Sequence, residues 1–273
     1  MLEKLNFEKG SSILIPSWNN LEYLSFCIES IKKNSYYKHE ILVHLNESRI
    51  DEAKSLLSKE IKFTASPDNI GICKSLNNLA KIATKDIIGY FNDDMVALPE
   101  WDLELQKFAN NHNCDENWVL ASTMIEPKGN NPCCIAPYDS GTDIQSFLEK
   151  EDNLIKSLPV LKSSSFSVIG STWPPNFLHK NLWNKIGGYD EDYNVGFGSD
   201  PDLIKRCYDV GCRNFIGVGS SLVYHFQCKT TNKIKHLNLG KDSGQLFKNK
   251  HGIDMMDFIN NILKRGHIFD ESK

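Results

Sequence analysis

The chain has 273 residues, with 31 lysines and arginines against 35 aspartates and glutamates and a formal net charge of -4. This balance argues against nucleic acid as a partner, because proteins that bind it usually carry a basic excess. Hydrophobic residues make up 40% of the chain, which is enough to build a large core without a structural metal or disulfide bonds.

The eight cysteines show no paired Cys-x-x-Cys spacing, so we expect no zinc site. The N-terminal residues carry no apolar signal region, and no apolar run approaches the roughly 18 residues that a membrane span needs. These features predict a cytoplasmic protein and leave a peripheral membrane contact open.

The N-terminal part of the chain alternates short apolar runs with apolar residues at helical spacing. Strands are predicted over 12–16, 40–45, 61–65 and 87–91, and helices over 21–31, 49–59 and 72–83. This alternation is typical of βαβ units, so we predict an α/β fold with a Rossmann-like, mostly parallel central sheet flanked by helices.

The C-terminal part is less regular. Strands are predicted over 119–125, 165–170 and 222–226, helices over 178–186 and 201–210, and two amphipathic helices between 240 and 265. Residues 126–144 are rich in proline, glycine and asparagine and are expected to form a long loop, while 154–161 are ambiguous.

Polar residues follow three of the predicted strands. The three segments are Pro16-Ser17-Trp18-Asn19, Asn46-Glu47-Ser48 and Asn92-Asp93-Asp94. Because ligands of open α/β sheets bind beyond the carboxyl ends of the strands, we expect these segments to converge on one edge of the sheet.

Asp93 and Asp94 repel each other unless something positive binds beside them. A Mg²⁺ or Mn²⁺ ion bound through one or two carboxylates and a diphosphate fits this chemistry. A solvated turn explains the same residues, since asparagine and aspartate favour turns.

Asn69 and Gly71 precede the helix predicted over 72–83. Glycine at this place lets a ligand approach the helix N-terminus, where free amides favour anions. An ordinary asparagine cap is the alternative interpretation.

Asp200 and Asp202 flank Pro201 at the start of the helix predicted over 201–210. Pro201 suits the first helical position and Asp200 the cap before it. One of the two carboxylates is also a candidate general base for an acceptor hydroxyl. The two roles are compatible, although capping would lower the pKa of Asp200 and weaken it as a base.

His225 lies near the end of the strand predicted over 222–226, on the face opposite Tyr224 and Phe226. On that face it can reach a metal as a neutral imidazole. A core or surface role is the alternative for a lone histidine.

Taken in order along the chain, these motifs resemble family 2 glycosyltransferases. The matching segments are residues 12–19, 69–72, 92–94, 187–192 and 199–203. Each motif alone is weak, but their order and spacing are specific, and the resemblance spans about residues 11–227. It implies a GT-A fold, a UDP- or GDP-sugar donor and direct displacement with inversion at the anomeric carbon.

The resemblance also implies roles for single residues. It places Pro16, Ser17 and Asn19 in the nucleotide pocket and Asn92 and Asp93 near the ribose and diphosphate. Further cofactor-binding candidates are Asn69, Gly71 and Lys74.

On the catalytic side, the resemblance implies that Asp94 is the principal ligand of Mn²⁺ or Mg²⁺ and that His225 is another. Asp200 matches the family's base, with Asp202 as the alternative. The segment 187–192 is expected on the acceptor side of the cleft.

Two positions depart from the family pattern. Many members carry an aspartate that reads the base after the second strand, where this chain has Leu45, which cannot accept a hydrogen bond. Asn46 is therefore our candidate for reading the base. The glutamate that commonly precedes the catalytic aspartate is Ser199 here, which favours Asp200 as the base.

We expect a GT-A domain over residues 1–230, with a nucleotide-binding half (11–100) and an acceptor-side half (101–230). A helical extension is expected over 231–273, packed on that domain. The acceptor stays open among glycans, lipid-linked sugars and proteins.

Two alternative functions remain. A sugar-nucleotide nucleotidyltransferase should show a glycine-rich loop after the first strand, which this chain lacks. A nucleotide-sugar-binding module without catalysis would not need Asp93, Asp94 and Asp200 together.

Overall fold

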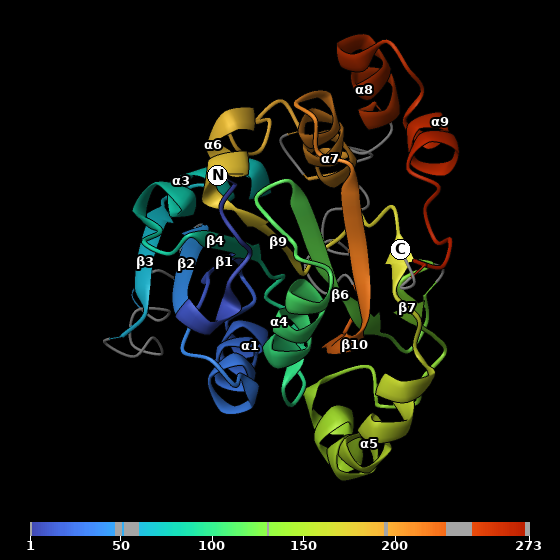
Figure 1. Ribbon diagram of the computed structural model, residues 1–273. Helices are drawn as coiled ribbons and strands as arrows, with labels where there is room; N and C mark the ends of the chain where they lie inside the picture. Colours follow the sequence, from blue (N-terminus) through green and yellow to red (C-terminus); the bar gives the residue numbers. More distant parts are fainter. Residues whose placement is uncertain are drawn as a thin grey trace.

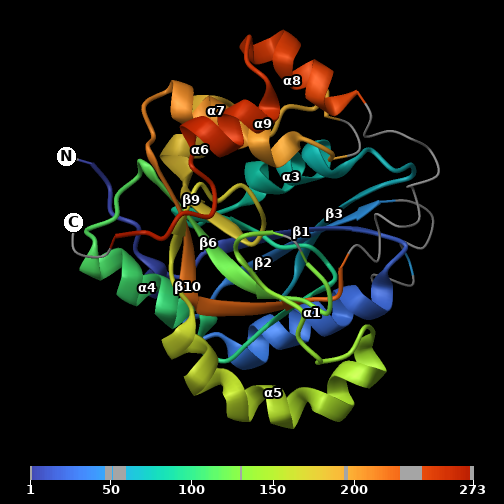
Figure 2. The same ribbon diagram turned by 90° about the vertical axis from the view of Figure 1, so that its right-hand side faces the viewer.

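One mixed, largely parallel sheet forms the centre of the computed structural model, and helices cover both of its faces (Figures 1 and 2). The structure describes residues 2–46, 51, 60–129, 131–193, 196–227 and 242–270. The helix predicted over 49–59 and most of the linker to the C-terminal helices lie outside these residues.

Within the described residues the sheet has ten strands. They are β1 (Ser12–Trp18), β2 (Glu40–Asn46), β3 (Lys62–Ser66), β4 (Ile87–Tyr90), β5 (Met95–Ala97), β6 (Trp118–Ile125), β7 (Cys134–Ile135), β8 (Val168–Ile169), β9 (Asn176–His179) and β10 (Asn214–His225). Eight of them follow the order β3-β2-β1-β4-β9-β6-β10-β5, while β7 pairs with β6 and β8 with β10. The strands β1 to β4 are parallel to one another, whereas β9 is antiparallel to both β4 and β6.

The helices are α1 (Leu21–Asn34), α3 (Ile72–Ile82), α4 (Trp101–Asn111), α5 (Ile144–Ser164), α6 (Lys180–Ile186), α7 (Ser199–Asp209), α8 (Ser243–His251) and α9 (Met255–Asp257). A 3-10 turn (Phe7–Lys9) precedes β1, and a π-helical turn (Phe258–Ile262) follows α9. No helix among the described residues is long and apolar enough to cross a membrane.

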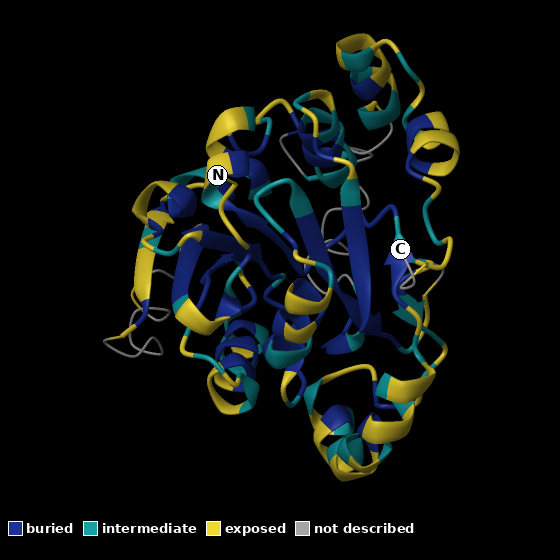
Figure 3. Cartoon of the chain, viewed as in Figure 1, coloured by how far each residue is buried: buried dark blue, intermediate teal, exposed yellow. Residues whose placement is uncertain are grey.

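The apolar run in β1 is continuous because this strand is buried on both faces. Ile13 and Ile15 pack on the side of α1, and Leu14, which points the other way, packs on the side of α3. Burying side chains of this size contributes roughly 1.5–3 kcal/mol each. Figure 3 shows the central strands of the sheet buried, the edge strand β3 largely exposed, and exposed outer faces on the helices.

β1 continues two residues beyond Pro16, where the sequence predicted its end. Its partner β4 ends at Tyr90, and the following amide, that of Phe91, donates to the carbonyl of Leu14. The pairing of β1 with β4 ends at Leu14, so Pro16 lies beyond the last residue that β4 pairs. The missing N–H of proline therefore removes no hydrogen bond from that paired stretch.

Three predictions of local structure were wrong or incomplete. The segment 178–186, predicted as a helix, contains the end of β9 and then α6. The loop predicted over 126–144 contains the short strand β7, and the ambiguous segment 154–161 lies inside α5. Neither β5 nor α4 was predicted. By contrast, two helices in the tail are confirmed as α8 and α9 with its π-helical turn.

Gly89→Ala is expected to destabilise the fold, because the added Cβ atom would lie 2.4 Å from Cε1 of Phe177. Phe177 is fully buried and its ring stacks on Trp101, so it cannot move without disturbing the core. Overpacking of this kind costs roughly 1–3 kcal/mol. Chemical denaturation will measure the change in the free energy of unfolding.

Gly244→Ala in α8 is the matched control, since nothing lies within 4 Å of the Cβ atom added there. Alanine restricts the unfolded chain more than glycine does, so this variant should be at least as stable as the parent. An equal loss of stability in both variants would contradict the clash at Gly89.

Candidate active site

The strand ends meet at one edge of the sheet, as the sequence predicts. Ser17 Oγ donates to Asp93 Oδ2 over 2.7 Å, which joins the end of β1 to the turn after β4. Trp18, the last residue of β1, pairs in register with Asn46, the last residue of β2. The convergence of these segments is therefore confirmed, while Glu47 and Ser48 lie outside the described residues.

Asp93 anchors its turn to β1. Besides Ser17, it accepts a hydrogen bond from Asn20 Nδ2 at its other oxygen, over 3.0 Å. Asp93 is 4% exposed, and two donors offset much of the cost of burying a carboxylate. Asn92 beside it accepts a hydrogen bond from the hydroxyl of Tyr90.

Asp94 lies next to His225 because β5 and β10 are neighbours. The amide of Phe226 donates to the carbonyl of Asp94, and His225 pairs with Met95 across the two strands. His225 Nε2 lies 3.3 Å from Asp94 Oδ1. The structure therefore brings these two side chains together, as the sequence predicts.

Glu126 completes this group, and the sequence analysis missed it. Its Oε1 lies 2.6 Å from His225 Nδ1, and Gln227 Nε2 and Cys134 Sγ donate to its Oε2. Glu126 is the first residue after β6, so it carries the same signal as the other strand-end residues. The sequence instead places Glu126 at the beginning of the loop predicted over 126–144.

The electrostatics of His225 follow from its two carboxylate neighbours. Burial alone would lower the pKa of its imidazole, but Asp94 and Glu126 raise the pKa to about 10. When no cation is bound, the imidazole therefore carries both protons near neutral pH, and a metal ion at Nε2 would displace the proton there. Its Nε2 atom is buried and makes no hydrogen bond, in spite of the nearby Asp94 oxygen.

A divalent cation fits this pair of side chains. One carboxylate oxygen and one imidazole nitrogen face the same point, and Glu126 fixes the ring from behind, as carboxylates commonly do for metal-binding histidines. Within the part of the chain that the structure describes, no three His, Cys, Asp or Glu side chains form a complete metal site. The remaining ligands of Mn²⁺ or Mg²⁺ would come from a diphosphate and water, as is usual for such ions.

Asp200 lies in the first turn of α7 and is not its cap, which corrects the prediction from sequence. The helix begins at Ser199, and Gly198 occupies the cap position with a left-handed φ of 81°. The pKa prediction was wrong as well. Burial raises the pKa of Asp200 to about 7, although a 2.8 Å hydrogen bond from the Tyr189 hydroxyl lowers it.

Asp202 is a poorer candidate for the role of general base. It is fully buried, and its oxygens lie 2.8 Å from Arg206 Nε and 2.7 Å from His251 Nε2. A carboxylate held by two basic side chains is a poor proton acceptor. The geometry therefore favours Asp200 over Asp202 as the candidate base.

Tyr90 links the two carboxylate centres. Burial raises the pKa of its hydroxyl well above the usual value, and the charges of Asp200, Asp94 and Asp93 add to this shift. The Tyr90 hydroxyl donates to Asn92, which precedes Asp93 and Asp94 in the chain, and the Tyr189 hydroxyl donates to Asp200. The ring of Tyr90 also packs edge-on against that of Tyr189, at 6.1 Å between centroids.

Asn46 has protein partners where we expected it to read a nucleotide base. Its Nδ2 donates to Ser75 Oγ over 3.1 Å, and its Oδ1 accepts from the amide of Ile70 and from Ser66 Oγ. These contacts join the ends of β2 and β3 to α3. Asn46 thus holds the ends of β2 and β3 against the beginning of α3, and its role as a base-reading residue stays a prediction.

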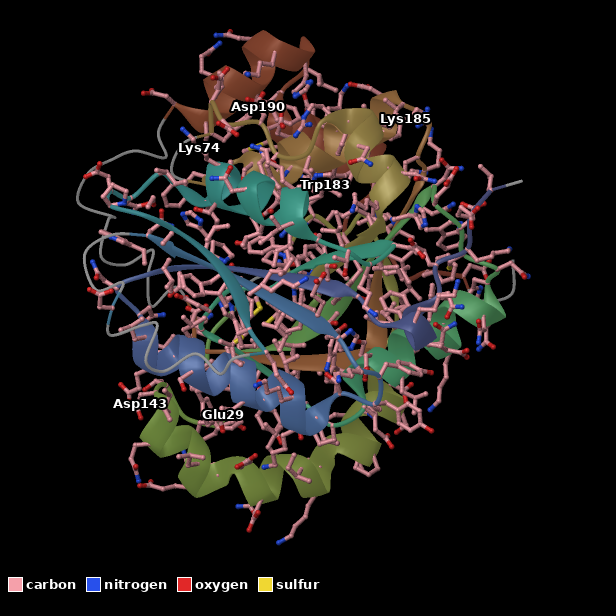
Figure 4. The ribbon with its side chains drawn as sticks, turned by 90° about the vertical axis from the view of Figure 1, so that its left-hand side faces the viewer. Glu29, Lys74, Asp143, Trp183, Lys185 and Asp190 are labelled. Carbon is pink, nitrogen blue, oxygen red and sulfur yellow. The ribbon has the colours of Figure 1, made fainter. Side chains whose placement is uncertain are left out.

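The other donor-side candidates border the same edge. Pro16 is buried in β1, and Asn19 is exposed with a φ of 50°. Gly71 caps α3 with a φ of 81° and donates its amide to Asn69 Oδ1 over 3.0 Å. Lys74 is exposed in the first turn of α3 (Figure 4).

A separate cavity of about 690 Å³ opens at the other edge of the sheet, near the beginning of β2. Lys38, His39 and Glu40 line it together with residues of α1. It contains none of the strand-end residues, so we do not assign the candidate site to it.

Residues 12–122 match the family model of Glycosyl transferase family 2. This segment of the chain is similar to family 2 glycosyltransferases. This segment holds the ends of β1, β2 and β4, so the resemblance drawn from the motifs is confirmed there. Asp200 and His225 lie beyond it.

The comparison with curated proteins finds a glucosyl-dolichyl phosphate glucuronosyltransferase of Haloferax volcanii. It is 20% identical over 238 residues, which cover 82% of this chain and 69% of that protein.

Two solved structures show the same fold. S. aureus TarS in complex with UDP has a TM-score of 0.54 at 14% identity, over 78% of this chain and 59% of that chain. GalNAc-T7 with UDP, GalNAc and Mn²⁺ has a TM-score of 0.58 at 12% identity, over 97% of this chain and 55% of that chain. The chain thus spans just over half the length of these proteins. The GT-A fold is confirmed.

Tyr189→Phe is expected to raise the pKa of Asp200 above its value of about 7. The phenol donates a hydrogen bond to the carboxylate, so its loss favours the protonated form of Asp200. An NMR titration of the aspartate carboxyl carbons will measure the shift.

Tyr208→Phe is the matched control, because Tyr208 faces Phe258 and Arg213 instead of Asp200. The titration of Asp200 in Tyr208→Phe should match its titration in the parent. An unchanged Asp200 titration in Tyr189→Phe would refute the role of the phenol.

Proposed function

We propose that this chain is a metal-assisted, inverting glycosyltransferase that moves a sugar from a UDP- or GDP-sugar to an acceptor hydroxyl. The observation that carries the proposal is a pair of acidic centres linked by Tyr90, which donates to Asn92, and by Tyr189, which packs on Tyr90 and donates to Asp200. One is Asp94 with His225, and the other is Asp200 with a pKa raised to about 7. The family match and the GT-A fold support it.

Asp200 is the base in this reaction. Its oxygen takes the proton of the acceptor hydroxyl while the acceptor oxygen forms a bond to the anomeric carbon. The bond between that carbon and the diphosphate oxygen breaks on the opposite side, so the configuration inverts and a nucleoside diphosphate leaves. A pKa near the working pH suits a general base, and burial supplies it here.

Asp94 and His225 would hold a Mn²⁺ or Mg²⁺ ion, which supplies positive charge to the departing diphosphate. Glu126 keeps the His225 ring in place through Nδ1. On the donor side, the free amides at the start of α3, behind Gly71, and the exposed Lys74 add positive potential for the diphosphate. Ser17, Asn92 and Asp93 would border the ribose.

The acceptor is proposed from the curated relative, whose name describes transfer to a glucosyl-dolichyl phosphate. We therefore place a lipid-linked sugar first among the acceptors, ahead of free glycans and proteins. UDP bound to two structural neighbours favours UDP-sugars as the first donors to test. The cytoplasmic location stays a prediction.

A donor screen tests the function directly. The protein is incubated with UDP- and GDP-sugars and with lipid-phosphate sugars, in Mn²⁺ and in EDTA, and the products are separated. Glycosyl transfer releases a nucleoside diphosphate, a nucleotidyltransferase would release pyrophosphate, and a binding module would release neither. Cation-dependent transfer with inversion is the expected result. Pyrophosphate release, or binding without turnover for every donor, would reject the proposal.

Asp94→Ala is expected to abolish the cation-dependent part of donor binding, because a principal oxygen ligand is lost. Isothermal titration with UDP in Mn²⁺ and in EDTA will measure it, and circular dichroism will check the fold. Asp86→Ala is the matched control, since Asp86 is an exposed aspartate at the opposite end of β4. Unchanged cation dependence in Asp94→Ala would remove Asp94 from the site.

Asp200→Asn is expected to cut transfer by at least about 10²-fold, the scale of a lost general base, and to leave donor binding near normal. In the parent, transfer should fall as the pH drops through about 7, because Asp200 then becomes protonated. Asp209→Asn is the control on the same helix, as Asp209 is an exposed partner of Lys205. If Asp200→Asn weakens donor binding but does not slow the transfer of sugar from bound donor, Asp200 is not the base.

A further inference from the structure

Helix α8 packs against the part of the fold that carries Asp200, although the two are separated in sequence. In Figures 1 and 2 it lies above α7. Phe247 of α8 is fully buried in the same apolar cluster as Leu203 and Ile204 of α7. Ser243 approaches the cap of α7 so closely that a Cβ atom on Gly198 would lie 3.1 Å from it.

Lys250, near the end of α8, holds the loop that precedes α7. Its Nζ lies 2.6 Å from both Asp190 Oδ2 and Asp192 Oδ2 (Asp190 is labelled in Figure 4). The ammonium group also lies 6.0 Å from the centre of the Tyr193 ring. Lys250 is 27% exposed, so its two ion pairs contribute little to overall stability.

His251, the next residue, reaches the same loop through the buried side chain of Asp202 and the partly buried side chain of Arg206. Its Nε2 lies 2.7 Å from Asp202 Oδ1, and the other oxygen of Asp202 accepts from Arg206 Nε. Arg206 Nη1 in turn donates to the carbonyls of Ile186 and Gly188, over 2.8 and 2.6 Å. A continuous chain of polar contacts therefore runs from α8 to the backbone just before Tyr189.

Tyr189 is the point where these contacts end. Its backbone exchanges two hydrogen bonds of 2.8 Å with the side chain of Asn77 on α3, and its hydroxyl donates to Asp200. The loop from Ile186 to Tyr193 is thus held from α3 on one side and from α8 on the other.

We propose that helix α8 is a positioning element of the catalytic site, with Lys250 and His251 holding the loop 186–193 so that Tyr189 stays hydrogen-bonded to Asp200. This inference rests on the proposed role of Asp200 as the base. It gives the C-terminal helices a part in the transfer step and assigns Asp202 to the polar chain that serves its neighbour. Neither Lys250 nor His251 touches the reacting atoms.

The test is a set of double-mutant cycles. Lys250→Met and His251→Ala are made in the parent and in Tyr189→Phe, and kcat and donor KM for transfer are measured. In the parent background each variant is expected to lower kcat, by up to about 10²-fold if the base moves by about 1 Å, and to leave donor KM unchanged. In Tyr189→Phe neither substitution should lower kcat further, because the contact they serve is already lost.

Two outcomes would overturn the proposal. One is an equal fall in kcat in both backgrounds, which would mean that α8 acts on general stability. The other is no fall in the parent. Lys248→Met is the matched control, because Lys248 is an exposed lysine of the same helix and should leave both constants unchanged. Lys250→Met is a change on the surface, so it will fold even if His251→Ala does not.

Hydrogen exchange of the amides of residues 186–193 separates this inference from the proposed function. Faster exchange in Lys250→Met than in Lys248→Met shows that α8 holds the loop, whether or not the protein transfers sugar. If the parent turns over no donor but the exchange differs, the reaction assignment fails and the α8 contacts stand. If exchange is identical in the two variants, the positioning role is refuted.

Discussion

The candidate site depends on how three carboxylates are accommodated at one edge of the sheet, where Asp93 and Asp94 are buried and Asp200 is half-buried. Burying an ionised carboxylate is expensive unless hydrogen bonds or opposite charges compensate. Asp93 receives two side-chain donors, from Ser17 of β1 and from Asn20 at the cap of α1, and Asp94 lies beside His225 and raises its pKa. Asp200 accepts a hydrogen bond from the Tyr189 phenol, and desolvation raises its pKa to about 7. Three chemically identical side chains thus differ in their hydrogen bonds, in their charged neighbours and in their pKa.

Sequence reasoning located the strand-end residues well because that signal is local. An apolar run followed by polar residues marks both the strand and its end, and topology brings the ends together. Glu126 carries the same signal at the end of β6, but the prolines and glycines after it suggested a loop. The partner of Glu126 is His225, which lies 99 residues away, and nothing in the sequence pairs them.

The two misassigned segments have separate physical causes. β9 is a four-residue strand buried on both faces, so it shows no alternation that would separate it from the adjoining α6. At α7, Pro201 suggested the first helical residue, but the left-handed conformation of Gly198 lets the helix begin earlier. That shift puts Asp200 inside the first turn, where burial sets its pKa and capping does not.

The two hydrogen bonds between Asn77 and the backbone of Tyr189 have a consequence for engineering. Asn77 belongs to α3, whose first residues border the donor, whereas Tyr189 belongs to the acceptor-side loop. A chimaera that imports this loop from a relative in order to change acceptor choice must therefore import a compatible residue at position 77 as well. A grafted loop whose backbone follows another path at position 189 would leave the part-buried Asn77 amide without its partners and loosen both proposed substrate sites at once.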